Sequence, residues 1–353
     1  GCLGFFTPSK NFKYKPFFFM SKTQLAIVGL GGIAQVNHIP ILSKMSDVEI
    51  SAVCDLELSK AKTIAAKYGI KKSYKDFDKM LEENPDVSAV IITAQTDAHK
   101  ELALKSFAAG KDVLVEKPIA RNYAEAEDIV EAAKKHKKKL MIGMNNRFRN
   151  DVMLMKTFVK GKEIGEPFYV KTGWTKIQSS DQKWFLEKEK AGGGVFLDNG
   201  IVMLDLGMWM LGFPEPLSVS AVNYNHNTKN VEDSSIVLIK FKNGSTLTIE
   251  TSWSLQRDGE LFYCNVFGKT GSSAINPLRI YKRMDEKLFN ITPKVVMPAN
   301  QFKKSYELEL QHFIKVINNE VSIISNGDEA LSRMKVVDAI YKSAQLGKEV
   351  IIK

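Results

Sequence analysis

The first part of the chain alternates short, almost continuously apolar runs with longer amphipathic runs. The apolar runs are rich in Val and Ile, which is typical of strands buried on both faces of a parallel sheet. The longer runs repeat apolar residues at helical spacing. Strands are expected at 24–32, 48–55, 86–94, 112–118 and 139–145, and helices at 33–44, 58–69, 98–110 and 122–138. This alternation predicts an α/β fold of the Rossmann type, with a doubly wound parallel sheet.

After Arg147 the alternation stops, and strand-like runs separated by turn signals follow one another. Strands are expected at 167–177, 217–225, 234–244, 245–255 and 261–271. Two helices, at 198–211 and 304–319, are expected to cover them, and a last helix spans 328–346. The pattern predicts a C-terminal α+β domain with a large, mostly antiparallel, open-faced sheet. An apolar open face needs a partner, which favours a homo-oligomer.

A length of 353 residues fits two domains. The expected dinucleotide-binding domain spans 20–145, and the expected substrate-binding and oligomerisation domain spans 146–353. Residues 1–19 lack the continuous apolar core of a signal peptide and are interpreted as an upstream extension or a flexible tail. The three scattered cysteines indicate neither a disulfide framework nor a metal site. They fit a reducing compartment, so a cytoplasmic location is expected.

The formal net charge of +10 raises the question of a nucleic-acid partner. The densest basic run, at 134–139, lies at the end of a predicted helix and is better explained as a solvated face. No RNA- or DNA-binding motif is visible, and no apolar run looks long enough to span a membrane. Neither a nucleic-acid nor a membrane partner is therefore expected.

The segment "GLGGIA" places Gly29, Gly31 and Ala34 at the spacing GxGxxA, between an expected strand and an expected helix. Gly29 permits a tight turn, Gly31 lets the backbone approach a pyrophosphate, and Ala34 lets the helix pack on its strand. Asp55 follows 21 residues after Ala34, at the end of the second strand. This context distinguishes a dinucleotide site from a simple turn. The Asp55 carboxylate can accept both ribose hydroxyls and repels a 2′-phosphate, so NAD is favoured over NADP.

Several ordered motifs, among them "VLVEKPIA", "GMNNRF" and "GGGVFLDNG", resemble the oxidoreductases grouped around glucose-fructose oxidoreductase, inositol dehydrogenase and MocA. The resemblance covers roughly residues 22–352. It implies a Rossmann domain followed by an open-faced α/β domain, a homodimer or homotetramer, NAD(P), and a sugar, cyclitol or related polyol as substrate. The implied reaction is a hydride transfer between nicotinamide and a CH–OH group.

The lysine of "EKP" is Lys117, and the resemblance places it near both nicotinamide and substrate, next to a commonly cis bond to Pro118. A partly desolvated lysine beside a cationic ring has a lowered pKa and can exchange a proton with a hydroxyl. The motif and the resemblance together imply cofactor contacts from Gly29, Gly31, Gly32, Ile33, Ala34, Asp55, Thr93, Thr96, His99, Glu116, Lys117 and Asn145. The implied substrate contacts are Lys117, Arg147, Asp198 and Asp205. Asn145 and Arg147 have a second interpretation, in which they only tie the domains together.

In the family, a histidine or tyrosine that exchanges the substrate proton lies between the two aspartates that match Asp198 and Asp205. That position is Val202 here, and valine cannot titrate. Three interpretations are open: Lys117 acts alone or with Asp198; another group enters the cleft; or the protein is a nucleotide-binding sensor with weak or no catalysis. The other groups considered are Tyr224, His226 and Tyr263. The enzyme interpretation is favoured because Lys117, Asp198 and Asp205 are all retained, with Lys117 and Asp198 as the catalytic candidates.

Two further expectations concern side chains whose position the sequence does not fix. His38, His226 and His312 look structural. Substrate choice is expected to depend on cleft side chains of the second domain, among which basic residues could favour an acidic sugar. The candidates are Trp174, Lys176, Trp184 and Arg257.

Overall fold

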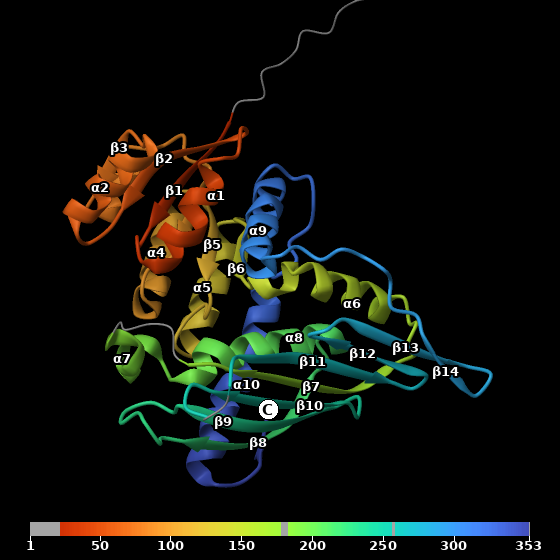
Figure 1. Ribbon diagram of the computed structural model, residues 1–353. Helices are drawn as coiled ribbons and strands as arrows, with labels where there is room; N and C mark the ends of the chain where they lie inside the picture. Colours follow the sequence, from red (N-terminus) through yellow and green to blue (C-terminus); the bar gives the residue numbers. More distant parts are fainter. Residues whose placement is uncertain (1–21, 178–182, 256–257, 353) are drawn as a thin grey trace, which may run out of the picture.

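The computed structural model describes residues 22–177, 183–255 and 258–352 (Figure 1). The expectations for residues 1–19 and for Arg257 fall outside these ranges. Two β-sheets organise the described chain, one formed by its first part and one by its second part. The last strand of the first sheet ends at Gly143, and the second sheet begins at Pro167.

The first sheet has six strands in the order β3-β2-β1-β4-β5-β6, and all neighbouring strands are parallel. Its strands are β1 (Thr23–Val28), β2 (Val48–Cys54), β3 (Lys72–Tyr74), β4 (Ala89–Ile92), β5 (Asp112–Glu116) and β6 (Leu140–Gly143). The strand order reverses between β1 and β4, and such a switch point opens a crevice at the carboxyl ends of the strands. The predicted doubly wound fold is confirmed.

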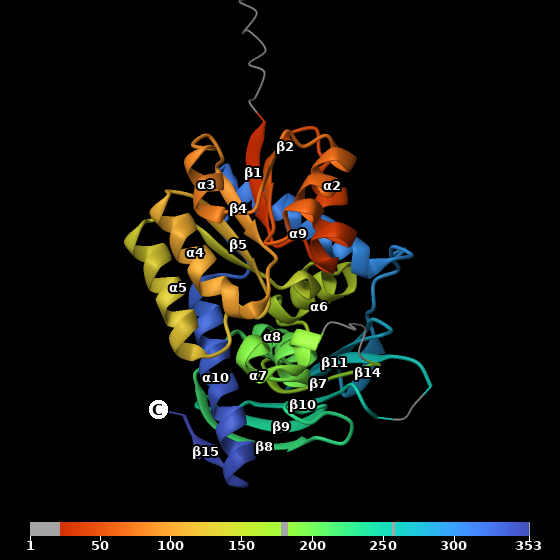
Figure 2. The same ribbon diagram turned by 90° about the vertical axis from the view of Figure 1, so that its left-hand side faces the viewer.

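Helices cover both faces of this sheet (Figure 2). Side chains alternate along a strand, so Ala26 and Val28 join one hydrophobic core, whereas Leu25 and Ile27 join the other. The first face packs against α3 (Phe77–Glu82), α4 (His99–Ala108) and α5 (Tyr123–Lys135). The second packs against α1 (Ile39–Leu42), α2 (Leu58–Tyr68) and α9 (Gln301–Ile317).

The edge strand β3 and the helix α3 were not expected from the sequence. β3 has only three residues, of which Tyr74 alone is buried. An edge strand this short carries no apolar run from which to predict it. Its effect on the site is indirect, because Tyr74 O accepts the backbone N–H of Asp55 at 3.1 Å.

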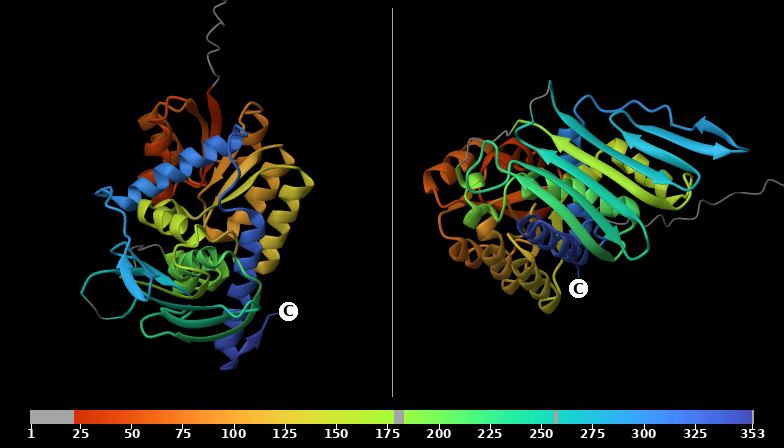
Figure 3. Two further views of the ribbon diagram at one scale, coloured as in Figure 1. Left: turned by 90° about the vertical axis from the view of Figure 1, so that its right-hand side faces the viewer. Right: turned by 90° about the horizontal axis from the view of Figure 1, so that it is seen from below.

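The second sheet has nine strands in the order β14-β13-β12-β11-β7-β10-β9-β8-β15 (Figure 3). They are β7 (Pro167–Thr175), β8 (Pro216–Tyr224), β9 (Ser234–Phe241), β10 (Thr246–Ser252), β11 (Leu261–Gly268), β12 (Gly271–Ile275), β13 (Arg279–Met284), β14 (Lys287–Asn290) and β15 (Val350–Ile351). Only the central β10–β7 pair is parallel within the described residues. The mostly antiparallel sheet is therefore confirmed.

One face of this sheet is covered by α6 (Asn150–Lys160), α8 (Ile201–Leu211) and α10 (Gly327–Leu346). The expectation that α9 also covers it is wrong. Tyr306, Leu310 and Phe313 of α9 are buried in the core of the parallel sheet instead. Helical periodicity shows that α9 has an apolar face, but it does not say which sheet receives that face.

By length and composition alone, the segment Lys188–Leu211 is long and apolar enough to cross a membrane. The expectation that no apolar run reaches this length is therefore wrong. However, 83% of its most apolar window is buried inside the protein. In α8, Asp205 is itself 1% exposed. A helix that is apolar on all sides is typical of the core of a large protein, and α8 lies there, between the two domains.

Candidate active site

A cleft of about 1340 Å³ lies at the carboxyl ends of the parallel strands, between the two sheets. The first domain lines it with the glycine loop, with Asp55, and with the segments that follow β4 and β5. The second domain contributes the end of β7, the segment around Gly193 and Asp198, and Tyr306 of α9. The cleft therefore unites motifs from both halves of the chain.

The glycine loop has the geometry that its spacing predicts. Gly29 has φ +85°, and a Cβ there would lie 2.4 Å from backbone atoms of Ala94, so only glycine fits. A Cβ at Gly31 or Gly32 would meet nothing within 4 Å, which leaves open space in front of the helix that begins with η1 (Ala34–His38). Ala34 is 0% exposed and does not line the cleft, so its role is to pack the helix on the sheet rather than to touch a ligand.

Asp55 lies where β2 ends and is held from several sides. Its Oδ2 accepts the backbone N–H of Leu30 at 2.8 Å, and its Oδ1 accepts that of Glu57 at 2.9 Å. The ammonium of Lys60 donates to Oδ1 at 3.0 Å. These contacts join the carboxylate to the glycine loop. A fixed carboxylate beside an open glycine loop fits the ribose and pyrophosphate of NAD.

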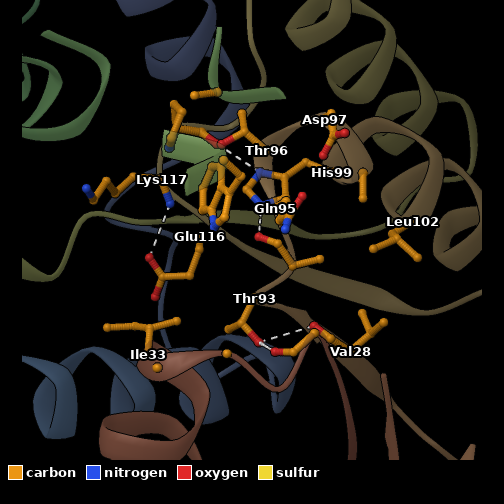
Figure 4. A pocket seen from close by; sticks show the side chains of 18 of the residues that line it. Val28, Ile33, Thr93, Gln95, Thr96, Asp97, His99, Leu102, Glu116 and Lys117 are labelled. Atoms are coloured by element: carbon orange, nitrogen blue, oxygen red, sulfur yellow. Dashed lines mark hydrogen bonds between the residues drawn. The ribbon is translucent and has the colours of Figure 1, made fainter. Parts of the chain in front are cut away.

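The segment after β4 closes the side of the cleft shown in Figure 4. Thr93 donates from Oγ1 to the carbonyl of Gly29 at 2.5 Å, and Thr96 lines the cleft at the start of η2 (Thr96–Ala98). His99 has its ring nitrogens 2.9 and 3.0 Å from the carbonyl oxygens of Pro118 and Ala94. Burial lowers the pKa of its imidazole. His99 thus links two cleft segments, and both of its ring nitrogens are engaged by backbone carbonyls.

Lys117 and Asp198 meet across the cleft. The ammonium of Lys117 donates to Oδ1 of Asp198 at 2.7 Å and to its carbonyl at 2.9 Å. Nε1 of Trp253 donates to Oδ2 of Asp198 at 3.3 Å. Burial alone would raise the pKa of the Asp198 carboxyl, but Lys117, Lys176 and these hydrogen bonds hold it below its usual value. Asp198 therefore stays ionised beside Lys117.

Glu116 and His38 form a second set of contacts next to Lys117. The Lys117–Pro118 peptide bond is cis, and the backbone N–H of Lys117 donates to Oε2 of Glu116 at 3.2 Å. Oε1 of Glu116 lies 2.6 Å from Nε2 of His38, which is 0% exposed. His38 therefore has a structural role, which is to fix the carboxylate of Glu116 next to Lys117.

Glu232 is a positioning residue that the sequence did not reveal. Its Oε1 accepts the backbone N–H groups of Gly194 and Phe196, each at 3.0 Å, and the hydroxyl of Tyr341 at 2.8 Å. A Cβ on Gly194 would lie 2.0 Å from the Glu232 carbonyl oxygen. The glycines before Asp198 therefore allow close packing on Glu232, which anchors the turn that carries Asp198.

Arg147 and Asp205 require a correction, because neither lines the cleft. Arg147 is 0% exposed and donates to Asp205 at 2.6 and 2.8 Å and to Glu329 at 2.6 Å. Arg333 donates to the same Asp205 at 2.6 Å. Burial would raise the pKa of the Asp205 carboxyl, but the two guanidinium groups hold it low. These residues form an ionic tie between elements, which is the second of the two interpretations left open for Arg147 and replaces the substrate contact expected for Asp205.

Asn145 lines the cleft, where a contact with the cofactor is possible. It belongs to η3 (Asn145–Phe148) and donates from Nδ2 to Oγ of Ser305 at 2.9 Å. Its neighbour Arg147 faces the buried tie. Of the two residues of this motif, Asn145 therefore lies in the cleft and Arg147 lies in the core.

Val202 lines the cleft with 3% exposure, so an apolar side chain does occupy this wall. The three groups considered as alternatives, Tyr224, His226 and Tyr263, do not line the cleft: Tyr224 stacks on His226 at 5.4 Å, and Tyr263 donates to Glu250 at 2.5 Å. His312 stays structural, accepting the backbone N–H of Ile324 at 3.2 Å.

Two titratable side chains that the sequence could not place do line the cleft: Lys176, which follows β7, and Tyr306 of α9. Burial, followed by the charges of Glu116, Glu309 and Asp198, raises the pKa of the Tyr306 phenol well above its usual value. Tyr306 is therefore a hydrogen-bond donor at neutral pH. It was missed because α9 had been assigned to the other sheet.

The glycine loop, the fixed Asp55 and the Lys117–Asp198 pair in one cleft define a nicotinamide-dependent oxidoreductase. Residues 23–144 match the family model described as "Oxidoreductase family, NAD-binding Rossmann fold", and residues 156–352 match its "C-terminal alpha/beta domain". The chain belongs to this glucose-fructose oxidoreductase, inositol dehydrogenase and MocA family of NAD-binding oxidoreductases.

Curated relatives and solved structures agree with this assignment. The D-glucoside 3-dehydrogenase of Escherichia coli (strain K12) is 30% identical, over 94% of this chain and 97% of its own. The scyllo-inositol 2-dehydrogenase (NAD(+)) of Bacillus subtilis (strain 168) is 28% identical, over 93% and 96%. The aldose-aldose oxidoreductase of Caulobacter crescentus, solved with glycerol, has a TM-score of 0.80 at 27% identity, covering 94% and 99%. The sensor interpretation finds no support among these dehydrogenases.

Proposed function

We propose that this protein oxidises a secondary alcohol of a sugar, cyclitol or related polyol with NAD. Its curated relatives are named as dehydrogenases of a glucoside and of inositols. NAD, when bound, supplies the hydride acceptor. In this chain Gly31, Gly32 and Asp55 would hold the dinucleotide, and Thr93, Thr96 and Asn145 would border its nicotinamide end.

Lys117 is the proton carrier in this proposal. The oxygens of Asp198 engage two N–H groups of Lys117, and no other described residue is bonded to Nζ, so its remaining position can face a substrate hydroxyl. In its neutral form Nζ would accept the hydroxyl proton as the alcohol is oxidised, and bound NAD would take the hydride from the same carbon. Asp198 orients the amine and stabilises its charged form after the transfer.

The observation that carries this proposal is the Lys117–Asp198 pair in the same cleft as the glycine loop. Its test is a screen of purified, NAD-saturated protein against polyols, cyclitols, aldoses and uronic acids, with NADH absorbance followed from about pH 6 to about pH 10. Turnover of at least one compound is expected. A protein that binds NAD but oxidises none of them, and reduces none of the corresponding ketones, contradicts the proposal.

We further infer that the open face of the second sheet binds a second copy of the chain, giving a homodimer or, by a further contact, a homotetramer. The side chains that point away from α8 include exposed apolar ones: Val222, Tyr224, Ile236, Leu238 and Phe267. Ile236 and Leu238 are 56% and 36% exposed although their neighbour Val237 is 1% exposed. A stable interface needs roughly 800 Å² from each partner, and a face this broad can supply it.

Light scattering is expected to give at least twice the monomer mass of 39.6 kDa. Combining Ile236→Lys with Leu238→Lys should produce monomers, because it places two charges in the centre of the face. The matched control is Val296→Lys, at a position 99% exposed and outside the sheet. A wild-type protein that is monomeric at micromolar concentration overturns the inference.

A cytoplasmic location belongs to the same proposal. It is supported by Cys54 and Cys264, which are free and buried. Fractionation of the source cells, with the protein detected by antibody, is the direct test.

A further inference from the structure

Lys176 places a second amine at the substrate end of the cleft. It follows the last residue of β7, and its backbone N–H donates to the carbonyl of Ser252 at 3.0 Å. Its ammonium lies 4.3 Å from the ring centroid of Trp174. Both residues line the cleft. The strand end and the indole therefore give this long side chain a defined direction.

The ammonium of Lys176 has no carboxylate within salt-bridge distance in the part of the chain that the structure describes. The two acids that act on it are already engaged, since Asp198 bonds Lys117 and Trp253, and Glu260 accepts Nε1 of Trp174. Burial lowers the pKa of Lys176, Asp198 raises it, and Lys117 lowers it again. Within the described residues, this cation is thus only partly compensated.

The other end of the same cleft shows the contrast. There, Lys60 pairs with Asp55 at 3.0 Å, and Lys105 pairs with Asp78 at 2.8 Å. Each of these two lysines therefore has a carboxylate partner within the protein. A partly buried ammonium without such a partner is a recognition group for an anion that arrives with a ligand.

Lys176 also lies within the electrostatic reach of the catalytic pair. Both Lys117 and Lys176 lower the pKa of the Asp198 carboxyl, and all three residues line the cleft. A substrate whose hydroxyl faces Lys117 would therefore present another part of its skeleton to Lys176. The aromatic rings of Trp174, Trp184 and Phe185 border the same end of the cleft and suit the apolar face of a sugar ring.

We propose that Lys176 selects substrates bearing a carboxylate, so that the preferred substrate is an acidic sugar or polyol such as a uronic or aldonic acid. This inference rests on the proposed function. A single ammonium beside an indole matches a monoanion. A phosphate ester, by contrast, carries up to two charges and is typically bound by several donors. The wall formed by Val202 offers no polar group for that purpose.

The test compares matched pairs that differ only at the terminal carbon: D-glucuronate with D-glucose, and D-galacturonate with D-galactose. Wild-type kcat/KM is expected to be higher for each uronate. Lys176→Met should lower the uronate-to-aldose ratio by about 10- to 100-fold, because a hydrogen bond to a charged group contributes about 1.5–3 kcal/mol. Lys176→Arg, which keeps the charge, should retain most of the ratio. Lys282→Met, outside the cleft, should leave the ratio unchanged.

Binding separates this inference from the proposed function. Calorimetry with NADH-saturated protein measures the Kd of D-glucuronate and of neutral D-glucuronamide without any turnover. Tighter binding of the acid, lost in Lys176→Met, supports the inference even if no compound is oxidised. Equal ratios and equal affinities in wild type and Lys176→Met overturn it while the oxidoreductase function stands. A preference for D-glucose 6-phosphate over D-glucuronate overturns it as well.

Discussion

The two ends of the cleft are built on different principles. At the cofactor end, Asp55 and the glycine loop are neighbours in a local strand–loop–helix unit, and Asp55 has backbone and lysine partners. At the substrate end, Lys117 and Asp198 are 81 positions apart, and Lys176 comes from a third segment. A site for a shared cofactor is thus encoded locally. The substrate site depends on long-range packing.

Lys117→Met should give the largest effect and would break the substrate end alone. Positioned proton transfer contributes about 10²- to 10⁴-fold, so turnover of any substrate found in the screen should fall by that order. NADH affinity, followed by fluorescence titration, should change by less than about tenfold. Lys117→Arg is the matched variant, because arginine keeps the charge near Asp198 but cannot give up a proton. If Lys117→Arg retains turnover, the role of this residue is electrostatic and another group carries the proton.

Arg147→Met tests the buried tie that the sequence had suggested as a substrate contact. Removing one partner of a buried ion pair costs about 3–5 kcal/mol, and Arg333 still covers part of Asp205, so about 3 kcal/mol is expected. Chemical denaturation monitors the loss. Lys134→Met is the control: Lys134 bridges Asp328 at the surface, with side-chain exposures of 63% and 74%, and such pairs contribute less than about 1 kcal/mol. Equal effects of the two changes would contradict the structural role.

The difference between the two ends also explains what the sequence could predict. Buried parallel strands and the glycine spacing have short-range signatures, so the doubly wound sheet, Gly29 and Asp55 followed from the residues themselves. Lys117, Asp198 and the unusual Val202 followed only from the family resemblance. Their contact across the cleft depends on how the second domain packs, and no periodicity encodes that.

The errors have the same origin. Arg147 and Asp205 are charged residues in a family motif, and only the packing of α8 and α10 shows that they neutralise each other in the core. Tyr306 was missed because the apolar face of α9 fits either sheet equally well in the sequence. Polar residues whose partners come from distant segments are therefore the hardest to assign.

Substitution of Asp55 tests whether this carboxylate sets the affinity for NADH and the preference for NADH over NADPH. Asp55→Asn removes the charge but keeps one acceptor, whereas Asp55→Ala also leaves the Leu30 N–H without its partner. NADH binding should weaken by about 10- to 100-fold in Asp55→Ala and less in Asp55→Asn, because hydrogen bonds to charged groups contribute about 1.5–3 kcal/mol. Both should bind NADPH better relative to NADH, since the repulsion of a 2′-phosphate is gone. Unchanged cofactor preference, measured by fluorescence titration, would show that Asp55 does not set it.

The smallest expected effect concerns Glu309, a buried carboxyl group on α9. Glu309 is 0% exposed, and neither of its carboxyl oxygens has a hydrogen-bond partner among the described residues. Burial, and then the charge of Glu116, raises its pKa well above the ordinary 4.5. The folded protein therefore keeps a proton there that the unfolded chain releases, and stability falls as the pH rises above about 4.5.

Glu309→Gln should remove this loss, because the amide keeps the shape without a charge to bury. The free energy of unfolding of the variant should exceed that of wild type by about 1 kcal/mol near pH 8, with the difference shrinking as the pH falls toward 5. Urea denaturation at several pH values measures this slope. A difference that grows toward acid pH instead would mean that Glu309 is ionised in the folded state.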